Sequence, residues 1–412
     1  MEFGEIIFYI IVFLALYVQV FLFITFITKR RELFHSEKKL PKSYPSIGMI
    51  VPCWNEERSV ERTILSLLCL NYPKDRLHIY VVDDGSTDGT WAAMKKFENF
   101  SQVYIFRKEN GGKHTALNFA LEKIETDLVS SIDADTILEC DALLTVVNFL
   151  EEKREVSAVG CTVLIGNPKT PTEKAQSIEY QMFAFSKKML GLISGVLVAP
   201  GAFSVFKREA LKSVGGWVAG HSLEDLELTF RLQKNGFKVN HCHGAIAHTK
   251  APNSIKKLFT QRLRWGYGFL KNIHDYRGMI LNKKMGNLGL FTIPMSIIAY
   301  ITLVFVFIYS WQRMAFLAYD KIVALKLIGW DSLIAGGIRL DWFFINTQAI
   351  SFISILLFFS ILVSIFLGRK ISGSKGGWYN VIWYFLIYSF TQPIWIMKSI
   401  YKYLFAKKVL WR

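Results

Sequence analysis

Acidic side chains stand where two apolar runs of the sequence end. The run LHIYVVDDG ends in Asp83 and Asp84, and the run LVSSIDAD ends in Asp133 and Asp135. Ligands of parallel sheets bind outside the carboxyl ends of the strands, so these carboxylates are candidates to meet a ligand. Carboxylate oxygens suit Mg²⁺ or Mn²⁺, and Mg²⁺ usually combines one or two carboxylates with substrate phosphates. The alternative is an ordinary polar turn in which Asp88 caps the next helix.

The segment NGGKHTALN places two glycines and Lys113 at the start of a predicted helix. Backbone N–H groups at a helix start, together with one lysine, can hold a phosphate group. The segment is not a P-loop, because Arg107 stands where that motif needs glycine. A turn with a surface lysine is the alternative interpretation.

A third group of acids lies in HSLEDLELTF, which contains Glu224 and Asp225. The spacing Ser222-x-x-Asp225 resembles a helix-capping box, which would explain one of these acids but not both. The helix dipole keeps carboxylates in a first helical turn ionised. An ionised Asp225 at the edge of a cleft is a candidate to accept a proton from a hydroxyl group.

Three histidines in VNHCHGAIAH superficially resemble a metal cluster: His241, His243 and His248. Alternate residues of a strand share one face, so two of the rings could meet a metal ion. No third ligand at a usual spacing supports a zinc site. We therefore predict histidines on a solvated strand face.

The segment QRLRWGYG, which begins at Gln261, places two arginines and two aromatic rings shortly before a long apolar stretch. Arginine and tryptophan are favoured at membrane–water interfaces, where their polar ends stay hydrated. That preference explains each residue separately. It does not explain their occurrence in the same chain as the acidic motifs.

Apolar runs rich in Val and Ile alternate with amphipathic helical patterns between about residues 45 and 250. The predicted strands cover 46–54, 77–85, 103–108 and 128–135, and the predicted helices cover 56–70, 88–98 and 113–124. Continuous apolar strands separated by helices are typical of a parallel sheet covered on both faces. The sequence therefore predicts an α/β domain that positions the acids at one edge of its sheet.

An uncharged apolar segment at 6–28 precedes this domain and is long enough to span a membrane. It is too long for a signal-peptide core, and no small-residue cleavage site follows it. The basic triplet at 29–31 predicts an uncleaved anchor whose C-terminal side lies in the cytoplasm.

Further apolar stretches at 288–310, 343–368 and 378–400 are candidate spans, and Pro393 is expected to kink the last one. The charged stretch 314–330 predicts an interfacial amphipathic helix. One anchor before the domain and three spans after it would place the basic C-terminus outside. A span at 314–330, a re-entrant last segment or an overridden charge bias would each resolve this conflict, and these alternatives stay open.

We therefore predict four parts of the chain. They are an anchor at 1–32, a cytosolic domain at 33–250, interfacial helices at 251–286 and a membrane region with about three spans at 287–412. The five scattered cysteines form no CxxC pair, which argues against a disulfide framework and fits a reducing compartment. The net charge of +16 comes with no nucleic-acid-binding motif, so we expect no nucleic-acid partner.

The order DDG, DAD, ED and QRLRW resembles the motifs of the processive family 2 glycosyltransferases. These enzymes are membrane synthases of poly-N-acetylglucosamine, hyaluronan, chitin and cellulose, and the layout of spans is most similar to that of bacterial poly-β-1,6-N-acetylglucosamine synthases. The resemblance runs from Ile47 into the first downstream span. It implies an α/β fold of GT-A type, with a mostly parallel sheet and helices on both faces, inserted between transmembrane helices.

On the donor side, the resemblance implies that Asp135 coordinates Mg²⁺ or Mn²⁺. The residues implied to contact the nucleotide sugar are Trp54, at the uracil ring, Asp83 and Asp84, at the nucleotide, Lys113, at the diphosphate, and Asp133, at the ribose and sugar.

On the acceptor side, the resemblance implies that Asp225 is the general base, with Glu224 beside it. This sequence has Ser-Leu before Glu-Asp, where the family usually has threonine or a small residue, but both acids are intact. The residues implied to serve the diphosphate and the acceptor sugar are Gln261, Arg262, Arg264 and Trp265.

The implied activity is inverting transfer of a sugar from a UDP-sugar to a growing β-linked polysaccharide at the cytoplasmic face of the cell membrane. N-acetylglucosamine is the favoured sugar, and a small membrane accessory subunit is a further expected partner. One alternative is transfer of a single sugar to a membrane lipid. Another is a non-catalytic subunit that senses a nucleotide, against which the intact motifs argue.

Overall fold

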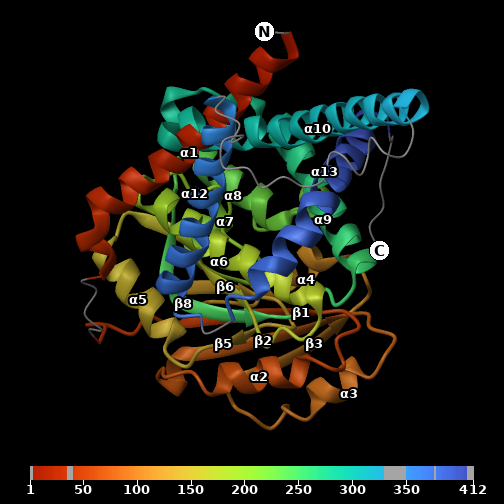
Figure 1. The fold of residues 1–412 in the computed structure, drawn as a ribbon. Coiled ribbons are helices and arrows are strands. Elements are labelled where there is room, and N and C mark those ends of the chain that lie inside the picture. Colours follow the sequence, from red (N-terminus) through yellow and green to blue (C-terminus); the bar gives the residue numbers. More distant parts are fainter. Residues whose placement is uncertain (1–2, 35–39, 329–348, 375–376, 406–412) are drawn as a thin grey trace. The chain divides into compact units, whose positions relative to one another are not determined.

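The computed structural model describes residues 3–34, 40–328, 349–374 and 377–405. The chain divides into two compact units. One unit comprises the described residues within Met1–Ile24 and Met295–Val363, and the other those within Thr25–Pro294 and Ser364–Arg412. The acids and the QRLRW segment all belong to the second unit, which is built around a single sheet (Figure 1).

That sheet has eight strands in the order β3-β2-β1-β4-β7-β6-β8-β5. The strands are β1 (Ile47–Cys53), β2 (Leu77–Asp84), β3 (Val103–Lys108), β4 (Leu128–Ile132), β5 (Ile137–Leu138), β6 (Val156–Ile165), β7 (Phe203–Lys207) and β8 (Lys238–Thr249). Strand β1 pairs in parallel with β2 and β4, and β2 pairs in parallel with β3. The predicted parallel arrangement is confirmed for these four strands. Strand β7 departs from it, because it runs antiparallel to both β4 and β6.

Side chains alternate between the two faces of the sheet, as the strand period of two requires. Ile79 and Val81 of β2 belong to one hydrophobic cluster, and Tyr80 and Val82 belong to the other. The first cluster includes residues of α2 (Val60–Leu68), α3 (Thr90–Lys95) and α5 (Ala142–Glu152), and the second includes residues of α4 (Lys113–Leu121), α7 (Arg208–Ser213) and α8 (Glu224–Lys234). Figure 1 shows α2 and α3 on one side of the sheet and α4 on the other. Both faces are therefore covered, as predicted.

The helix predicted from residue 56 begins only at Val60. The preceding residues form a loop in which Asn55 has a φ of 56° and Glu56 donates its backbone N–H to Thr90 Oγ1 at 2.7 Å. The N–H of Asn55 is bound by Ser86 Oγ at 2.9 Å. These contacts tie the end of β1 to the turn after β2, so they hold the chain out of a helical path.

Two long helices pack against the last described helix. Helices α6 (Pro171–Leu192) and α9 (Ile255–Asp275) both contact α13 (Asn380–Phe405). In this contact, the guanidinium of Arg262 forms a buried ion pair with Glu179, which also accepts a hydrogen bond from Tyr388 Oη at 2.7 Å. The QRLRW segment is thus anchored by a buried charge pair.

Three helices are long and apolar enough to cross a membrane among the residues that the structure describes: Ile6–Arg30 in α1 (Phe3–Phe34), Leu288–Leu327, which includes most of α10 (Ile293–Ile328), and Phe352–Ser372 in α12 (Ala349–Ser372). The stretch predicted as a separate interfacial helix from residue 314 is instead the second half of α10 as far as Ile328. The predicted span at 378–400 lies largely in α13, which does not meet the same criterion. The number of C-terminal spans stays a prediction.

Candidate active site

Lys113 joins two of the predicted acids. Its ammonium lies 2.6 Å from Asp133 Oδ1 and 2.7 Å from Glu224 Oε1. The three residues come from different elements: Lys113 begins α4, Asp133 follows β4, and Glu224 begins α8. Burial by itself would lower the pKa of Lys113, but the two carboxylates raise it above its usual value, so the lysine is a permanent cation.

Asp225 lies beside this group and is oriented by backbone donors. Gly201 donates its N–H to Asp225 Oδ2 at 3.0 Å, and Leu226 donates to Oδ1 at 2.8 Å. The predicted capping box is wrong. Helix α8 has Leu223 at its N-cap with no side-chain capping bond among the described residues, and Ser222 has a φ of 69° in the preceding turn.

The two acids at the start of α8 differ in their electrostatics. Burial would raise the pKa of Glu224, but the contact with Lys113 lowers it below the usual range. Burial raises the pKa of Asp225, and the charge of Glu224 raises it further. When the environments of two neighbouring carboxylates drive their pKa values apart, the two groups suit different roles. Glu224 is held as a permanent anion, and Asp225 is the better proton acceptor.

Asp135 follows β4, shortly after Asp133. Thr249 donates its hydroxyl to Asp135 Oδ1 at 3.1 Å. Burial and the neighbouring charges of Asp133 and Glu56 raise the pKa of Asp135 to about 6. Burial and nearby like charges disfavour the ionised form of a carboxylate, and a bound cation favours that form again.

The donor set around Asp135 fits Mg²⁺ or Mn²⁺ only in part. Among the described residues, no three His, Cys, Asp or Glu side chains are arranged to hold a metal ion. A cation that takes two carboxylates and completes its shell with water and phosphate needs no such cluster. Asp135 and Asp133 are the two carboxylates that this arrangement offers.

Asp83 and Asp84 are both buried at the end of β2 and have partners within the chain. Asp84 accepts the ammonium of Lys108 at 2.7 Å and the N–H groups of Gly111 and Gly112 at 3.1 and 2.8 Å. Asp83 accepts the N–H of Ser86 at 2.9 Å, and Arg107 Nε lies 3.1 Å from its other oxygen. Asp84 thus shapes the glycine loop that leads to Lys113.

Trp54 follows β1 and is 48% exposed. The end of β1 is in register with the end of β2, where Cys53 pairs with Asp83. A large exposed ring at this edge is available for stacking on a planar ligand.

The two arginines of the QRLRW segment on α9 lie in different environments. Arg264 donates Nη1 to the carbonyl of Ser222 at 2.9 Å, and its charge helps to lower the pKa of Glu224. Arg262 instead enters the buried pair with Glu179, and its guanidinium lies 4.1 Å from the ring centre of the half-buried Trp265. The structure thus brings Arg264 to the acids and directs Arg262 away from them.

Gln261 is part of the same helix and is half-buried, and its carbonyl oxygen Oε1 is buried without a hydrogen-bond partner among the described residues. The structure therefore gives Gln261 no hydrogen bond to the acidic group.

The prediction of histidines on a solvated strand face is wrong for His241. This ring is buried, its Nε2 lies 3.3 Å from Thr162 Oγ1, and burial lowers its pKa well below the usual value. His243 contacts the buried Lys188, and burial together with that cation lowers the pKa of His243 to about 4. Helix α6 covers this face of β8, which the strand pattern did not reveal.

A family model described as "Glycosyltransferase like family 2" matches residues 45–268, which is more than half of the chain. The chain belongs to glycosyltransferase family 2. The matched range contains every candidate residue of the site described above. The expected family membership is confirmed.

Two curated relatives of this family 2 chain are poly-β-1,6-N-acetyl-D-glucosamine synthases. The synthase of Staphylococcus epidermidis is 29% identical over 64% of this chain and 63% of its own length. The synthase of Staphylococcus aureus strain COL is 30% identical over 58% of this chain and 59% of its own length. The chain thus matches about three fifths of the length of these relatives.

A solved structure supports the fold. The mannosyltransferase PcManGT of Pyrobaculum calidifontis, in complex with GDP-Man and Mn²⁺, aligns with a TM-score of 0.57 at 18% identity, over 97% of this chain and 100% of its own. The predicted GT-A type fold, with a mostly parallel sheet and apolar helices before and after the domain, is confirmed.

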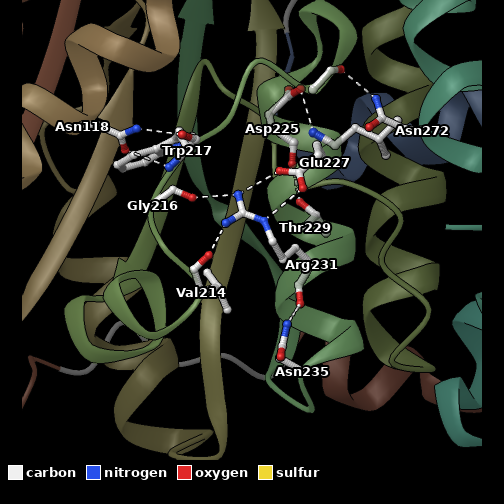
Figure 2. Close-up of polar contacts among 12 residues, drawn as sticks. Asn118, Val214, Gly216, Trp217, Asp225, Glu227, Thr229, Arg231, Asn235 and Asn272 are labelled. Atoms are coloured by element: carbon white, nitrogen blue, oxygen red, sulfur yellow. Dashed lines mark hydrogen bonds and ion pairs between the residues drawn. The ribbon is translucent and has the colours of Figure 1, made fainter. Parts of the chain in front are cut away.

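Sequence patterns missed some residues of this family 2 site. Gly201 contacts the base candidate through its backbone, and Lys108 neutralises Asp84. Thr229 accepts the N–H of Ala199 at 3.0 Å and lies one helical turn after Asp225 (Figure 2). The spacing Asp225-x-x-x-Thr229 places both side chains on one face of the helix and is the one available signal.

Proposed function

We propose that the chain transfers N-acetylglucosamine from UDP-N-acetylglucosamine to the end of a growing β-linked polysaccharide, with inversion at the anomeric carbon. The observation that supports this function most directly is the bridge from Lys113 to Asp133 and Glu224, with Asp225 beside it. This bridge brings the donor-side and acceptor-side acids of the family motifs into one site. The names of the staphylococcal relatives support the sugar and the polymer.

In the proposed reaction, Asp225 accepts the proton of the acceptor hydroxyl as its oxygen attacks the anomeric carbon. The bond to the diphosphate breaks on the opposite side, and UDP leaves with the electron pair. The raised pKa of Asp225 suits this role, because a general base works best when its pKa lies near the working pH. Glu224 stays ionised and holds Lys113 near the leaving group.

The leaving diphosphate gathers negative charge, which cationic groups must stabilise. Lys113 and Arg264 are the side chains that we assign to this task. Asp135 and Asp133 would hold Mg²⁺ or Mn²⁺, which supplies charge neutralisation at the diphosphate when bound. The Mn²⁺ of the Pyrobaculum mannosyltransferase is consistent with a cation in this fold.

The apolar helices support an acceptor that leaves through or along the membrane. We assign Trp265 as the platform for the acceptor sugar, since sugar C–H faces pack on indole rings, and Trp54 as the ring beside the uracil. The catalytic unit would face the cytoplasm, because the basic triplet follows the first span.

Incubation of purified membranes with each UDP-sugar in turn tests this function. We expect UDP release and a long polymer with UDP-N-acetylglucosamine, and loss of both when EDTA removes the divalent cation. Mg²⁺ or Mn²⁺ should restore activity. Release of UDP with a single-sugar glycolipid as product would favour transfer to a membrane lipid. The absence of UDP release from every donor would refute the proposed activity.

The pH dependence of transfer gives a further prediction for Glu224→Gln. The negative charge of Glu224 raises the pKa of Asp225, so removing it should lower that pKa and move the acid limb of the kcat profile to lower pH. The same change frees Lys113 to approach Asp225, which acts in the same direction. The pH profile of UDP release measures the effect. An acid limb that stays in place or moves upward contradicts the assignment of Asp225.

A further inference from the structure

The loop at 199–201 lies alongside the first turns of α8 and makes two similar hydrogen bonds to that helix. Gly201 donates its N–H to Asp225 Oδ2, and Ala199 donates its N–H to Thr229 Oγ1, both at 3.0 Å. Asp225 and Thr229 are four residues apart, so they lie on one face of the helix. The N–H groups on either side of Pro200 therefore bind side chains on successive turns of the helix.

Thr229 closes this arrangement into a circuit of hydrogen bonds. Its hydroxyl accepts from Ala199 and donates to the carbonyl oxygen of Asp225 at 2.7 Å (Figure 2). Thr229 is only 1% exposed, so water does not compete for its hydroxyl. A buried circuit in which each polar group has a partner is rigid and sensitive to the loss of one member.

Strand β6 packs closely against the same loop. A Cβ atom at Gly160 of β6 would lie 2.8 Å from Pro200 Cδ and 3.0 Å from Ala199 Cα. Ser204 also donates its hydroxyl to the carbonyl of Pro200 at 2.7 Å. The loop is thus confined between β6 and α8.

Gly201 lies where the donor-side and acceptor-side groups meet. A Cβ atom at this position would lie 2.9 Å from Lys113 Nζ and 3.6 Å from Asp225 Oδ2. The missing side chain therefore leaves the space that the ammonium occupies. The backbone of this segment therefore binds Asp225, and the absence of a side chain at Gly201 leaves room for Lys113.

We propose that residues 199–201 form a brace that orients the carboxylate of Asp225 toward the acceptor, with Thr229 as a positioning residue. This inference rests on the proposed function, because it assigns the brace to the general base of that reaction. A shift of about 1 Å in a reacting group can cost on the order of 10²-fold in rate. The brace acts on the chemical step and not on nucleotide binding, since neither Ala199 nor Thr229 contacts the donor-side acids.

The test compares Thr229→Val with Thr229→Ser in the full chain. Valine removes the hydroxyl and keeps the volume, whereas serine keeps the hydroxyl. For Thr229→Val we expect kcat to fall by about 10- to 100-fold, with unchanged UDP affinity. The acid limb of the pH profile should move upward, because the N–H of Gly201 helps to lower the pKa of Asp225. Thr229→Ser should restore kcat and the pH profile.

Thr145→Val on α5 is the matched control, since Thr145 also donates its hydroxyl to the carbonyl four residues earlier, at 2.9 Å. It should leave kcat and the acid limb unchanged. Gly160→Ala approaches the brace from the sheet and should reproduce the loss in kcat. Wild-type kcat in Thr229→Val, or equal losses in the valine and serine variants, would overturn the brace. Failure of the wild-type chain to release UDP would instead overturn the proposed function.

Discussion

Replacing Asp225 by asparagine is expected to leave UDP binding intact and to reduce sugar transfer by about 10²- to 10⁴-fold, which is the usual contribution of a general base. Asparagine keeps an oxygen that can accept the N–H of Gly201, so the local structure should persist. It has no basic oxygen to take the proton of the acceptor hydroxyl. UDP release under saturating donor and a separate UDP titration measure the two properties. Transfer at the wild-type rate would refute the base assignment.

Glu227→Gln is the matched control for this experiment. Glu227 is buried on the same helix, but it pairs with Arg231 at 2.8 Å (Figure 2). It also accepts a hydrogen bond from Tyr276 Oη at 2.6 Å. Its role is therefore to hold α8 in place. We expect Glu227→Gln to lower the melting temperature while kcat stays near that of the wild type. A loss of transfer as large as that of Asp225→Asn would show that any buried acid on α8 has the same effect.

The second large effect concerns the two arginines of the motif. Arg262→Met should destabilise the second unit by about 3–5 kcal/mol, because it leaves the carboxylate of Glu179 buried without its cation. Arg264→Met should leave stability unchanged, since Arg264 is only partly buried and its one hydrogen bond in the described structure is to a carbonyl. It should instead lower the transfer rate by roughly 10²- to 10³-fold, as expected when one donor to a developing anion is removed.

Thermal unfolding in detergent and UDP release separate these two outcomes. The double variant Glu179→Gln with Arg262→Met should recover part of the lost stability, because the uncompensated charge is gone. Unchanged stability in Arg262→Met would show that the buried pair does not anchor α9. A destabilised Arg264→Met chain with normal transfer would exclude Arg264 from the diphosphate site.

The positions of the acids along the chain were sufficient to predict part of the group of residues around Lys113. Asp133 follows a parallel strand, and its meeting with Lys113 follows from the common edge of the sheet. The convergence of Glu224 with these two residues was not predictable from local patterns. It depends on how α8 packs on the loop before β7, whose N–H groups bind Asp225 and Thr229.

The different environments of Arg262 and Arg264 show a second limit of sequence patterns. Residues two apart on a helix point to different sides, and here Arg264 binds the carbonyl of Ser222 while Arg262 pairs with Glu179. Which side faces the acids depends on how α9 packs on α6 and α13. The same limit applies to His241, whose burial depends on α6, a helix that ends at Leu192, far earlier in the chain.

The bridge made by Lys113 has a consequence for turnover. The ammonium already has two anionic partners before any nucleotide arrives. In the proposed reaction, donor entry is therefore an exchange of counter-ions, and we expect the free energy of the contact that must be broken to reduce the affinity for UDP. The same contact would re-form as the spent nucleotide departs, so the two carboxylates would compete for the ammonium of Lys113 and hasten product release. The proposed repeated addition of sugars to one polymer would gain from a site that clears itself after each step.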